Sequence, residues 1–225
     1  MFLAAIVSVL CSSGLIEGPS RCVEYARAGE IVVYGAEALD HLPAEDFEHR
    51  IFVARGSRRF EINTLDLNLG EPRRMGEVSA RINEFAVQGR RYADIVVQGT
   101  LSGSGGITET VDFIFALEGG ELRLVSRIET GGHARSGWSW EDEDASDVYA
   151  SERGLVVVMR TKHQRNLTVR CTISRQAYAF RDGELRWRRL TATELDHLLP
   201  ALEPLPRLWD REALPCCDRC KVERP

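Results

Sequence analysis

Apolar and polar residues alternate with a period of two over much of the chain, and glycine-containing turns separate the alternating segments. In the clearest case, 111–128, apolar residues recur at alternate positions on both sides of Gly119-Gly120. Gly-Gly favours a two-residue type I′ turn because both central residues need a positive φ. A turn of this length determines the register, so we expect Phe115 to lie opposite Leu124.

A second hairpin of the same form is predicted around Asp182-Gly183, another favoured type I′ pair. Its register should place Tyr178 opposite Trp187 and Phe180 opposite Leu185. The segments 113–123 and 176–186 share Ala, Gly, Glu, Leu and Arg at matching positions. The similarity suggests two related halves, 77–132 and 151–193. The alternative is that favoured hairpins simply resemble one another.

Further segments have strand-like patterns. Residues 31–35 form a short apolar run, and 47–69 predicts a hairpin that turns at Gly56-Ser57. Within 77–87 the apolar positions change parity between Ile82 and Phe85, which predicts two strands or a β-bulge.

Near the C-terminus the pattern changes to that of a helix. Thr191 and Glu194 have capping-box spacing, and a stripe of leucines follows them. The predicted fold class is therefore mainly β: an antiparallel meander of about ten strands that forms a sandwich or barrel, with a short C-terminal helix.

The N-terminal segment resembles a secretory signal peptide. Residues 1–10 are apolar except Ser8, and small residues follow. However, no Lys or Arg precedes the run and no A-x-A site is present, so a buried strand or helix of a cytoplasmic protein is the alternative. The run is shorter than the ~20 residues of a membrane span. We expect a secreted or periplasmic protein, not membrane-spanning, with a signal peptide at 1–20, one β-rich domain at 21–210 and a cysteine-containing tail at 211–225.

Composition limits the partners. The chain is 44% hydrophobic and 28% charged, as in ordinary globular proteins. The formal net charge of −5 does not favour binding to nucleic acid or to anionic membranes. Arg186 and Arg188 flank Trp187, but alternation places them on the opposite sheet face, so they form no stacking platform.

Cysteine spacing suggests disulfide bonds. Of the six cysteines, cleavage of a signal peptide would remove Cys11 and leave five. We expect them to tie the termini to the body of an exported protein, with one thiol free or paired between molecules. Unpaired thiols, or metal or redox chemistry at Cys217-x-x-Cys220, are the alternatives. The disulfide candidates are Cys22, Cys171, Cys216, Cys217 and Cys220.

The segment 131–151 is rich in glycine, serine and acidic residues, and it is predicted to be an exposed loop. Asp142, Asp144 and Asp147 are candidate ligands for Ca²⁺, which prefers carboxylate oxygens. As an EF-hand loop, however, the segment has Asp147 where glycine is required. A solvated acidic loop is therefore the alternative.

The same segment contains the candidate binding residues. No H-E-x-x-H or G-x-S-x-G motif occurs in the chain, so no catalytic residue is identified. The sequence favours an exported, non-catalytic binding or accessory β domain that presents this loop to a protein or glycan of the envelope or extracellular space. The alternative is a secreted hydrolase, metal-assisted, with acids from 131–151. Ca²⁺ is the one cofactor considered, and the binding candidates are His133, Trp138, Trp140 and Tyr149.

Overall fold

The computed structural model describes most of the chain from Ser20 onward. The described ranges are 20–38, 50–63, 66–67, 69, 75–101, 107–136, 140–151, 154–165, 168–181, 184–188, 191, 193–194, 203–208 and 221–222.

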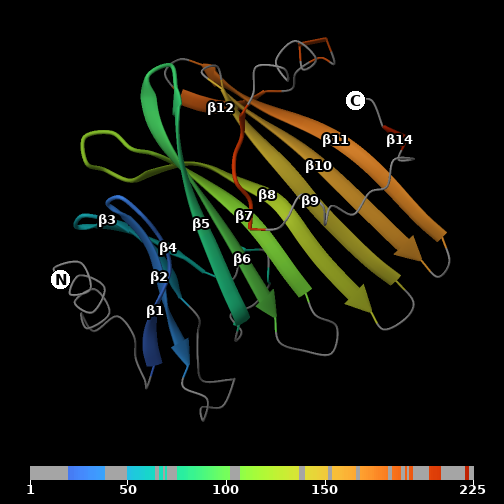
Figure 1. Ribbon diagram of the computed structural model, residues 1–225, viewed down its shortest axis with the longest axis horizontal. Coiled ribbons are helices and arrows are strands. Elements are labelled where there is room, and N and C mark those ends of the chain that lie inside the picture. Colours follow the sequence, from blue (N-terminus) through green and yellow to red (C-terminus); the bar gives the residue numbers. More distant parts are fainter. Residues whose placement is uncertain are drawn as a thin grey trace.

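The described residues form two β-sheets (Figure 1). The smaller sheet has the order β1-β2-β3-β4, and all its neighbouring strands are antiparallel. Its strands are β1 (Ser20–Ala28), β2 (Ile31–Ala38), β3 (Ile51–Arg55) and β4 (Arg58–Ile62).

The larger sheet is an antiparallel meander in the order β12-β11-β10-β9-β8-β7-β6-β5. Two short strands are attached to it: β13 pairs with β9, and β14 pairs with β11. The mainly β, antiparallel fold class is confirmed, with fourteen strands in the described part of the chain. The strands are β5 (Met75–Val87), β6 (Arg90–Leu101), β7 (Ile107–Ala116), β8 (Arg123–Ser136), β9 (Trp140–Ser151), β10 (Gly154–Arg165), β11 (Thr168–Arg181), β12 (Glu184–Arg188), β13 (Glu203–Pro204) and β14 (Lys221–Val222).

The register of the first predicted hairpin is confirmed. Phe115 pairs with Leu124 across β7 and β8. Gly119 and Gly120 have φ angles of 58° and 80°, as a type I′ turn requires. The N–H of Glu121 closes the turn by donating to the carbonyl oxygen of Glu118 at 2.8 Å.

The second hairpin, β11–β12, also has the predicted register. Tyr178 pairs with Trp187 and Phe180 with Leu185, although their side chains lie outside the described part. The predicted halves 77–132 and 151–193 contribute β5–β8 and β10–β12 to the same sheet, with β9 between them.

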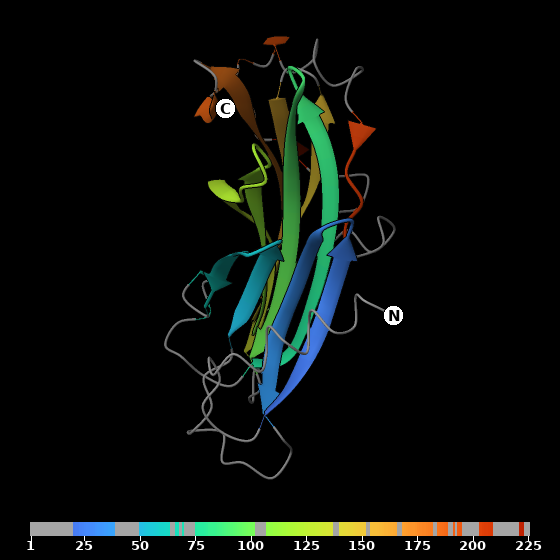
Figure 2. The same cartoon turned by 90° about the vertical axis from the view of Figure 1, so that its left-hand side faces the viewer.

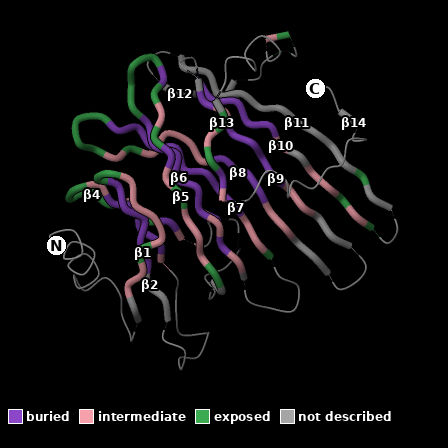
Figure 3. The backbone as a smooth tube through the Cα atoms, viewed as in Figure 1, coloured by how far each residue is buried: buried purple, intermediate pink, exposed green. Residues whose placement is uncertain are grey.

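The two sheets pack face to face around one apolar core. In Figure 2 the small sheet, blue to cyan, lies along one end of the larger sheet. Phe60 of β4 meets Phe115 of β7 edge to face, with ring centroids 5.2 Å apart. Figure 3 shows buried positions in the strands of both sheets, including parts of β9 and β10. The core residues include Ile31, Val33, Ile51, Val53, Ile62, Ile95, Val97, Val111, Phe113 and Phe115.

A second apolar cluster lies on the opposite face of the larger sheet. This sheet curls, which brings β5 into contact with β9 and β12 into contact with β8. Strands β5 to β10 all contribute to the cluster, and Leu205 packs against it. Its buried members are Val87, Tyr92, Ile114, Ala116, Ile128, Val148, Ala150, Leu155 and Val157.

Strand β5 corrects one prediction. Its pairing with β6 is uninterrupted from Glu77 to Val87, so the predicted break or bulge at the parity change is wrong. Val78 and Ile82 pack on the core between the sheets, whereas Phe85 and Val87 pack on the opposite face. The parity changes because each end of one continuous strand is covered on a different face.

The predicted loop at 131–151 is also wrong. Residues 131–136 end β8, and 140–151 form β9. Strand β9 pairs along its whole length with β10, whose residues 154–158 are buried. Pairing with an apolar neighbour therefore outweighs the polar composition of this segment.

The predicted C-terminal helix is described only at its first turn. The N–H of Thr191 donates to Glu194 Oε2 at 2.9 Å, and the N–H of Glu194 donates to Thr191 Oγ1 at 3.3 Å. These reciprocal bonds are those of a capping box. Thr193 and Glu194 are helical, and the leucine stripe lies outside the described residues.

Candidate functional site

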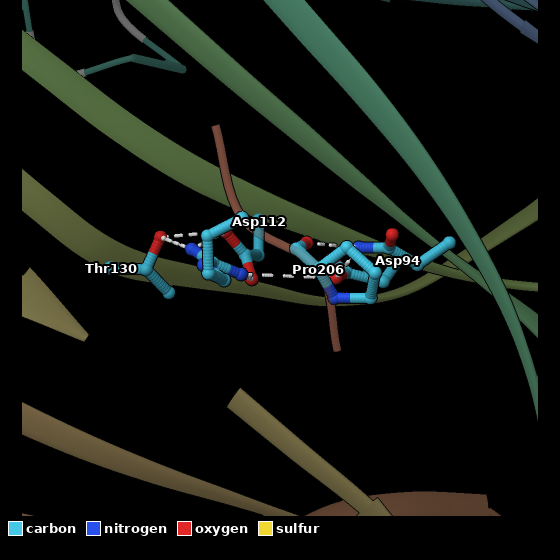
Figure 4. Close-up of polar contacts among 6 residues, drawn as sticks. Asp94, Asp112, Thr130 and Pro206 are labelled. Carbon is cyan, nitrogen blue, oxygen red and sulfur yellow. Dashed lines mark hydrogen bonds and ion pairs between the residues drawn. The ribbon is translucent and has the colours of Figure 1, made fainter. Parts of the chain in front are cut away.

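Four buried polar side chains meet on the curled sheet (Figure 4). Asp94 lies on β6, Asp112 on β7 and Thr130 on β8, and Arg207 follows β13. The first three have no exposed surface, and Arg207 is 8% exposed. We call these four residues the arginine–carboxylate network.

Arg207 holds Asp112 with both arms of its guanidinium group. Nη1 donates to Asp112 Oδ2 at 2.5 Å, and Nη2 donates to Oδ1 at 2.8 Å. Nη2 also donates to Thr130 Oγ1 at 2.7 Å, and that hydroxyl donates to Asp112 Oδ1 at 2.6 Å. A bidentate arginine–carboxylate contact of this kind is both strong and geometrically specific.

Asp94 joins the network through Asn83. The amide nitrogen of Asn83 donates to Asp94 Oδ2 and to the carbonyl oxygen of Pro206, each at 3.0 Å. Arg207 Nη1 lies 3.9 Å from Asp94 Oδ2. Asp94 Oδ1 has no hydrogen-bond donor among the described residues.

Strand pairing accounts for these positions. Asn83 and Asp94 are direct cross-strand partners on β5 and β6, and Asp112 lies directly opposite Ile128. Thr130 sits at a β-bulge, because Val111 pairs with Glu129 but the preceding residue, Thr110, pairs with Gly131. Bulges re-aim side chains, and here the bulge accompanies the contact of Thr130 with Asp112.

Residues 203–208, which we call the C-terminal strap, bring Arg207 to this place. Glu203 pairs with Ala150 and Pro204 with Tyr149, and the N–H of Leu205 donates to the carbonyl oxygen of Val148 at 2.8 Å. Strand β8 pairs with β9 only as far as Gly131 and Ala145. The strap therefore occupies the edge of β9 beyond the point where β8 has separated from it.

Burial controls the charges of the network. It raises the pKa of Asp94 well above its ordinary value, and the negative charge of Asp112 raises it further against the opposing effects of Arg207 and Asn83. Burial acts to lower the pKa of Arg207, but Asp112 outweighs it and the pKa is raised. Burial and Asp112 therefore favour the neutral form of Asp94, whereas Asp112, Asp94 and Asp147 favour the charged form of Arg207.

Glu109, on β7, is a second carboxyl group with a raised pKa. Burial, followed by the charges of Glu129 and Asp144, raises the pKa of Glu109 from 4.5 to about 7. Its carboxylate lies over Gly132, where an added Cβ would come within 2.9 Å of Oε2.

These two groups predict that stability falls as pH rises from about 4.5 to 8. Above the unfolded pKa the native state binds more protons than the unfolded state, so ∂ΔG/∂pH is negative until the folded pKa is passed. Melting temperatures at pH 5, 6, 7 and 8 should show the decline, and Asp94→Asn and Glu109→Gln should each reduce it. Glu121→Gln, on the exposed turn, should leave it unchanged. An equal slope in all four proteins would contradict the assignment.

The structure places Tyr149 far along the sheet from His133 and Trp140, which are three of the four binding residues predicted from sequence. His133 is half-buried on β8, opposite Glu143 of β9, and Trp140 begins β9 at the same end of the sheet. Tyr149 lies roughly 30 Å further along the extended strand, beside Pro204. Trp138 and the side chain of Trp140 lie outside the described residues.

The predicted metal ligands also do not gather as a loop would gather them. Alternation along β9 puts positions 142 and 144 on one face and Asp147 on the other. Asp147 is buried, and Arg207 interacts with its charge. Among the described residues no three His, Cys, Asp or Glu side chains form a metal-binding group.

The cysteine candidates lie mostly outside the described side chains. Cys22 is on β1 and is not a free thiol. Cys171 lies on β11, where its backbone pairs with Lys162. Cys216, Cys217 and Cys220 lie outside the described residues.

The sequence-based predictions missed the network entirely, although two of its members left a signal. Asp94 stands between Tyr92 and Val96 on one face of β6, and the other face of that strand is also apolar. Asp112 has the same setting on β7. A carboxyl group in a strand that is apolar on both faces needs a buried partner. Arg207 could not be found this way, because it is 95 residues from Asp112.

Fold and network together define the class: a two-sheet antiparallel β protein whose C-terminal strap is secured by a buried arginine–carboxylate network. Comparison with protein-family models, with curated proteins and with solved structures finds no match to the chain. Within the described residues, no helix has the length and apolar character needed to cross a membrane.

Proposed function

We propose that this protein is an exported, non-catalytic binding or accessory β domain. The observation that carries the proposal is the state of Asp94 and Asp112, which have no exposed surface, while Arg207 and Thr130 hold Asp112. A carboxylate that acts as a general acid or base must reach the substrate. These two carboxyl groups instead anchor the strap, which is a role in architecture.

The surface that we propose for binding is a polar row across β7 to β10. His133 lies opposite Thr108 and Glu143, and Glu143 lies opposite Lys162. These side chains are partly accessible, and Lys162 Nζ donates to Glu143 Oε2 at 3.4 Å. Adjacent hydrogen-bonding groups on one face of a sheet suit a glycan or a protein partner. Trp140 begins β9 at this end of the sheet.

Binding to an immobilised glycan panel and to isolated envelope fragments tests the proposal. We expect saturable binding that Lys162→Ala and His133→Ala each weaken about tenfold, which corresponds to ~1.4 kcal/mol. Glu121→Ala, at the far hairpin turn, is the control and should bind normally. Turnover of a bound glycan would refute the non-catalytic role. Binding that neither substitution weakens would refute this face as the binding surface.

We expect an exported protein of this kind to contain a disulfide bond. Cys22, which is not a free thiol, supports this expectation. A bond from Cys22 to one of the three C-terminal cysteines would enclose most of the chain and stabilise it by roughly 4–5 kcal/mol in the chain-entropy model. A reducing agent should therefore lower the melting temperature clearly. Thiol counting on denatured, unreduced protein made in an oxidising compartment should find one free thiol. Five free thiols would exclude both the disulfides and this argument for export.

A further inference from the structure

The edge of β9 next to the strap has the features of a peptide-binding slot. It offers the carbonyl oxygen of Val148 as an acceptor and an apolar surface that receives Leu205. It also offers the buried carboxyl groups of Asp94 and Asp112 to the residue two positions after that leucine, which in the strap is Arg207. Main-chain pairing gives affinity in strand addition, and side-chain pockets give specificity. We propose that this slot accepts an extended segment of a partner protein with an arginine two residues after a leucine, in exchange for the strap.

The strap leaves part of the slot unsatisfied. The Ser146 hydroxyl is fully buried, and it lies on β9 two residues before Val148 on the same face. Its oxygen has no hydrogen-bond partner among the described residues, and neither has Asp94 Oδ1. An unmade hydrogen bond of a buried polar group costs about 1–3 kcal/mol. A segment that brings hydrogen-bonding groups to these atoms would therefore bind better than the strap does.

The two sides of the strap are held by different kinds of contact. The N–H of Leu205 points to β9, so alternation points positions 204 and 206 away from it. Both positions are proline and have no N–H to donate. On that side the strap is held through the Pro206 carbonyl, which accepts from Asn83, and through the side chain of Arg207. A segment without these prolines would have two further donors to offer.

Charge complementarity defines the ligand. The slot contains the carboxyl groups of Asp94 and Asp112, and the strap brings one cation, Arg207, to them. The bidentate contact with Asp112 requires the planar fork of a guanidinium group, which lysine lacks. The inference goes beyond the proposed function and uses a different surface, since the row of His133, Glu143 and Lys162 takes no part in it.

The test uses the full chain and a fluorescent peptide with the strap sequence, LEPLPRL (residues 202–208). Wild-type protein should bind it weakly because its own strap competes. R207Q, which removes the guanidinium group from the slot, should bind it at least ~10-fold more tightly, by fluorescence anisotropy. A peptide with lysine in place of arginine should bind R207Q about 10-fold more weakly than the arginine peptide does. His133→Ala in the R207Q background is the control and should not change the affinity.

Further variants keep the outcome clear. The double variant D112N/R207Q should not bind the peptide. If R207Q does not fold, R207K replaces it in the assay, because lysine retains the positive charge but lacks the planar guanidinium group. Folded R207Q and R207K that do not bind the peptide would overturn the proposal. A concentration-dependent dimer of the wild-type protein that D112N dissolves would assign the slot to a second copy of the chain, and would overturn it as well. Neither result bears on glycan or envelope binding at the polar row.

Discussion

Asp112→Asn should lower the free energy of unfolding by about 3–5 kcal/mol. The substitution preserves the shape of the side chain but removes the negative charge that faces Arg207 in a site with no exposed surface. The guanidinium group then stays buried without its bidentate counter-charge, and only the weaker effects of Asp94 and Asp147 remain. Urea denaturation at pH 7, monitored by tryptophan fluorescence, measures the loss.

Asp94→Asn is the matched comparison. It is an equally conservative change in an equally buried carboxyl group of the same network. Because burial and the charge of Asp112 raise the pKa of Asp94 and so favour its neutral form, we expect a much smaller loss than for Asp112→Asn, with stability maintained better toward pH 8. Equal losses in the two variants would contradict our inference that the negative charge lies on Asp112 more than on Asp94.

Phe115→Ala should cost about 3–5 kcal/mol, the range typical of large-to-small substitutions at buried phenylalanines. Phe115 has no exposed surface and packs against Phe60 of the small sheet. Its removal takes apolar area from the core and leaves a cavity between the sheets. Urea denaturation measures this effect too, and a double-mutant cycle with Phe60→Ala should give a coupling of about 0.5–1.5 kcal/mol.

Ile107→Ala is the control on the same strand. Ile107 is 40% exposed, so its truncation should change stability by no more than about 0.5 kcal/mol. A Phe115→Ala loss as small as that of Ile107→Ala, or a coupling of zero with Phe60, would mean that the small sheet does not pack on this part of β7.

Local chemistry made the hairpins predictable. Gly119-Gly120 tolerates two positive φ angles, and a two-residue turn leaves one register in which Phe115 meets Leu124. The capping box of Thr191 and Glu194 is local in the same way, because the residues that bond are three positions apart. In each case turn or cap geometry and residue identity are sufficient, and they also led correctly to the mainly antiparallel β class.

Longer-range packing explains where prediction failed. The parity change in 77–87 has the pattern of a break, but β5 is continuous and is covered on different faces at its two ends. The composition of 131–151 is that of a loop, but pairing with β10 makes it a strand. Both outcomes depend on neighbours that a local pattern does not identify.

The turns, the hairpin registers and the fold class could therefore be predicted, because they follow from interactions between residues close in the chain. The buried faces and the docking site of the strap depend on long-range packing. Arg207 meets Asp112 across 95 residues, and Asn83 meets Pro206 across 123. Such contacts form because buried charges and amides require partners, and the curl of the sheet determines which partners are within reach.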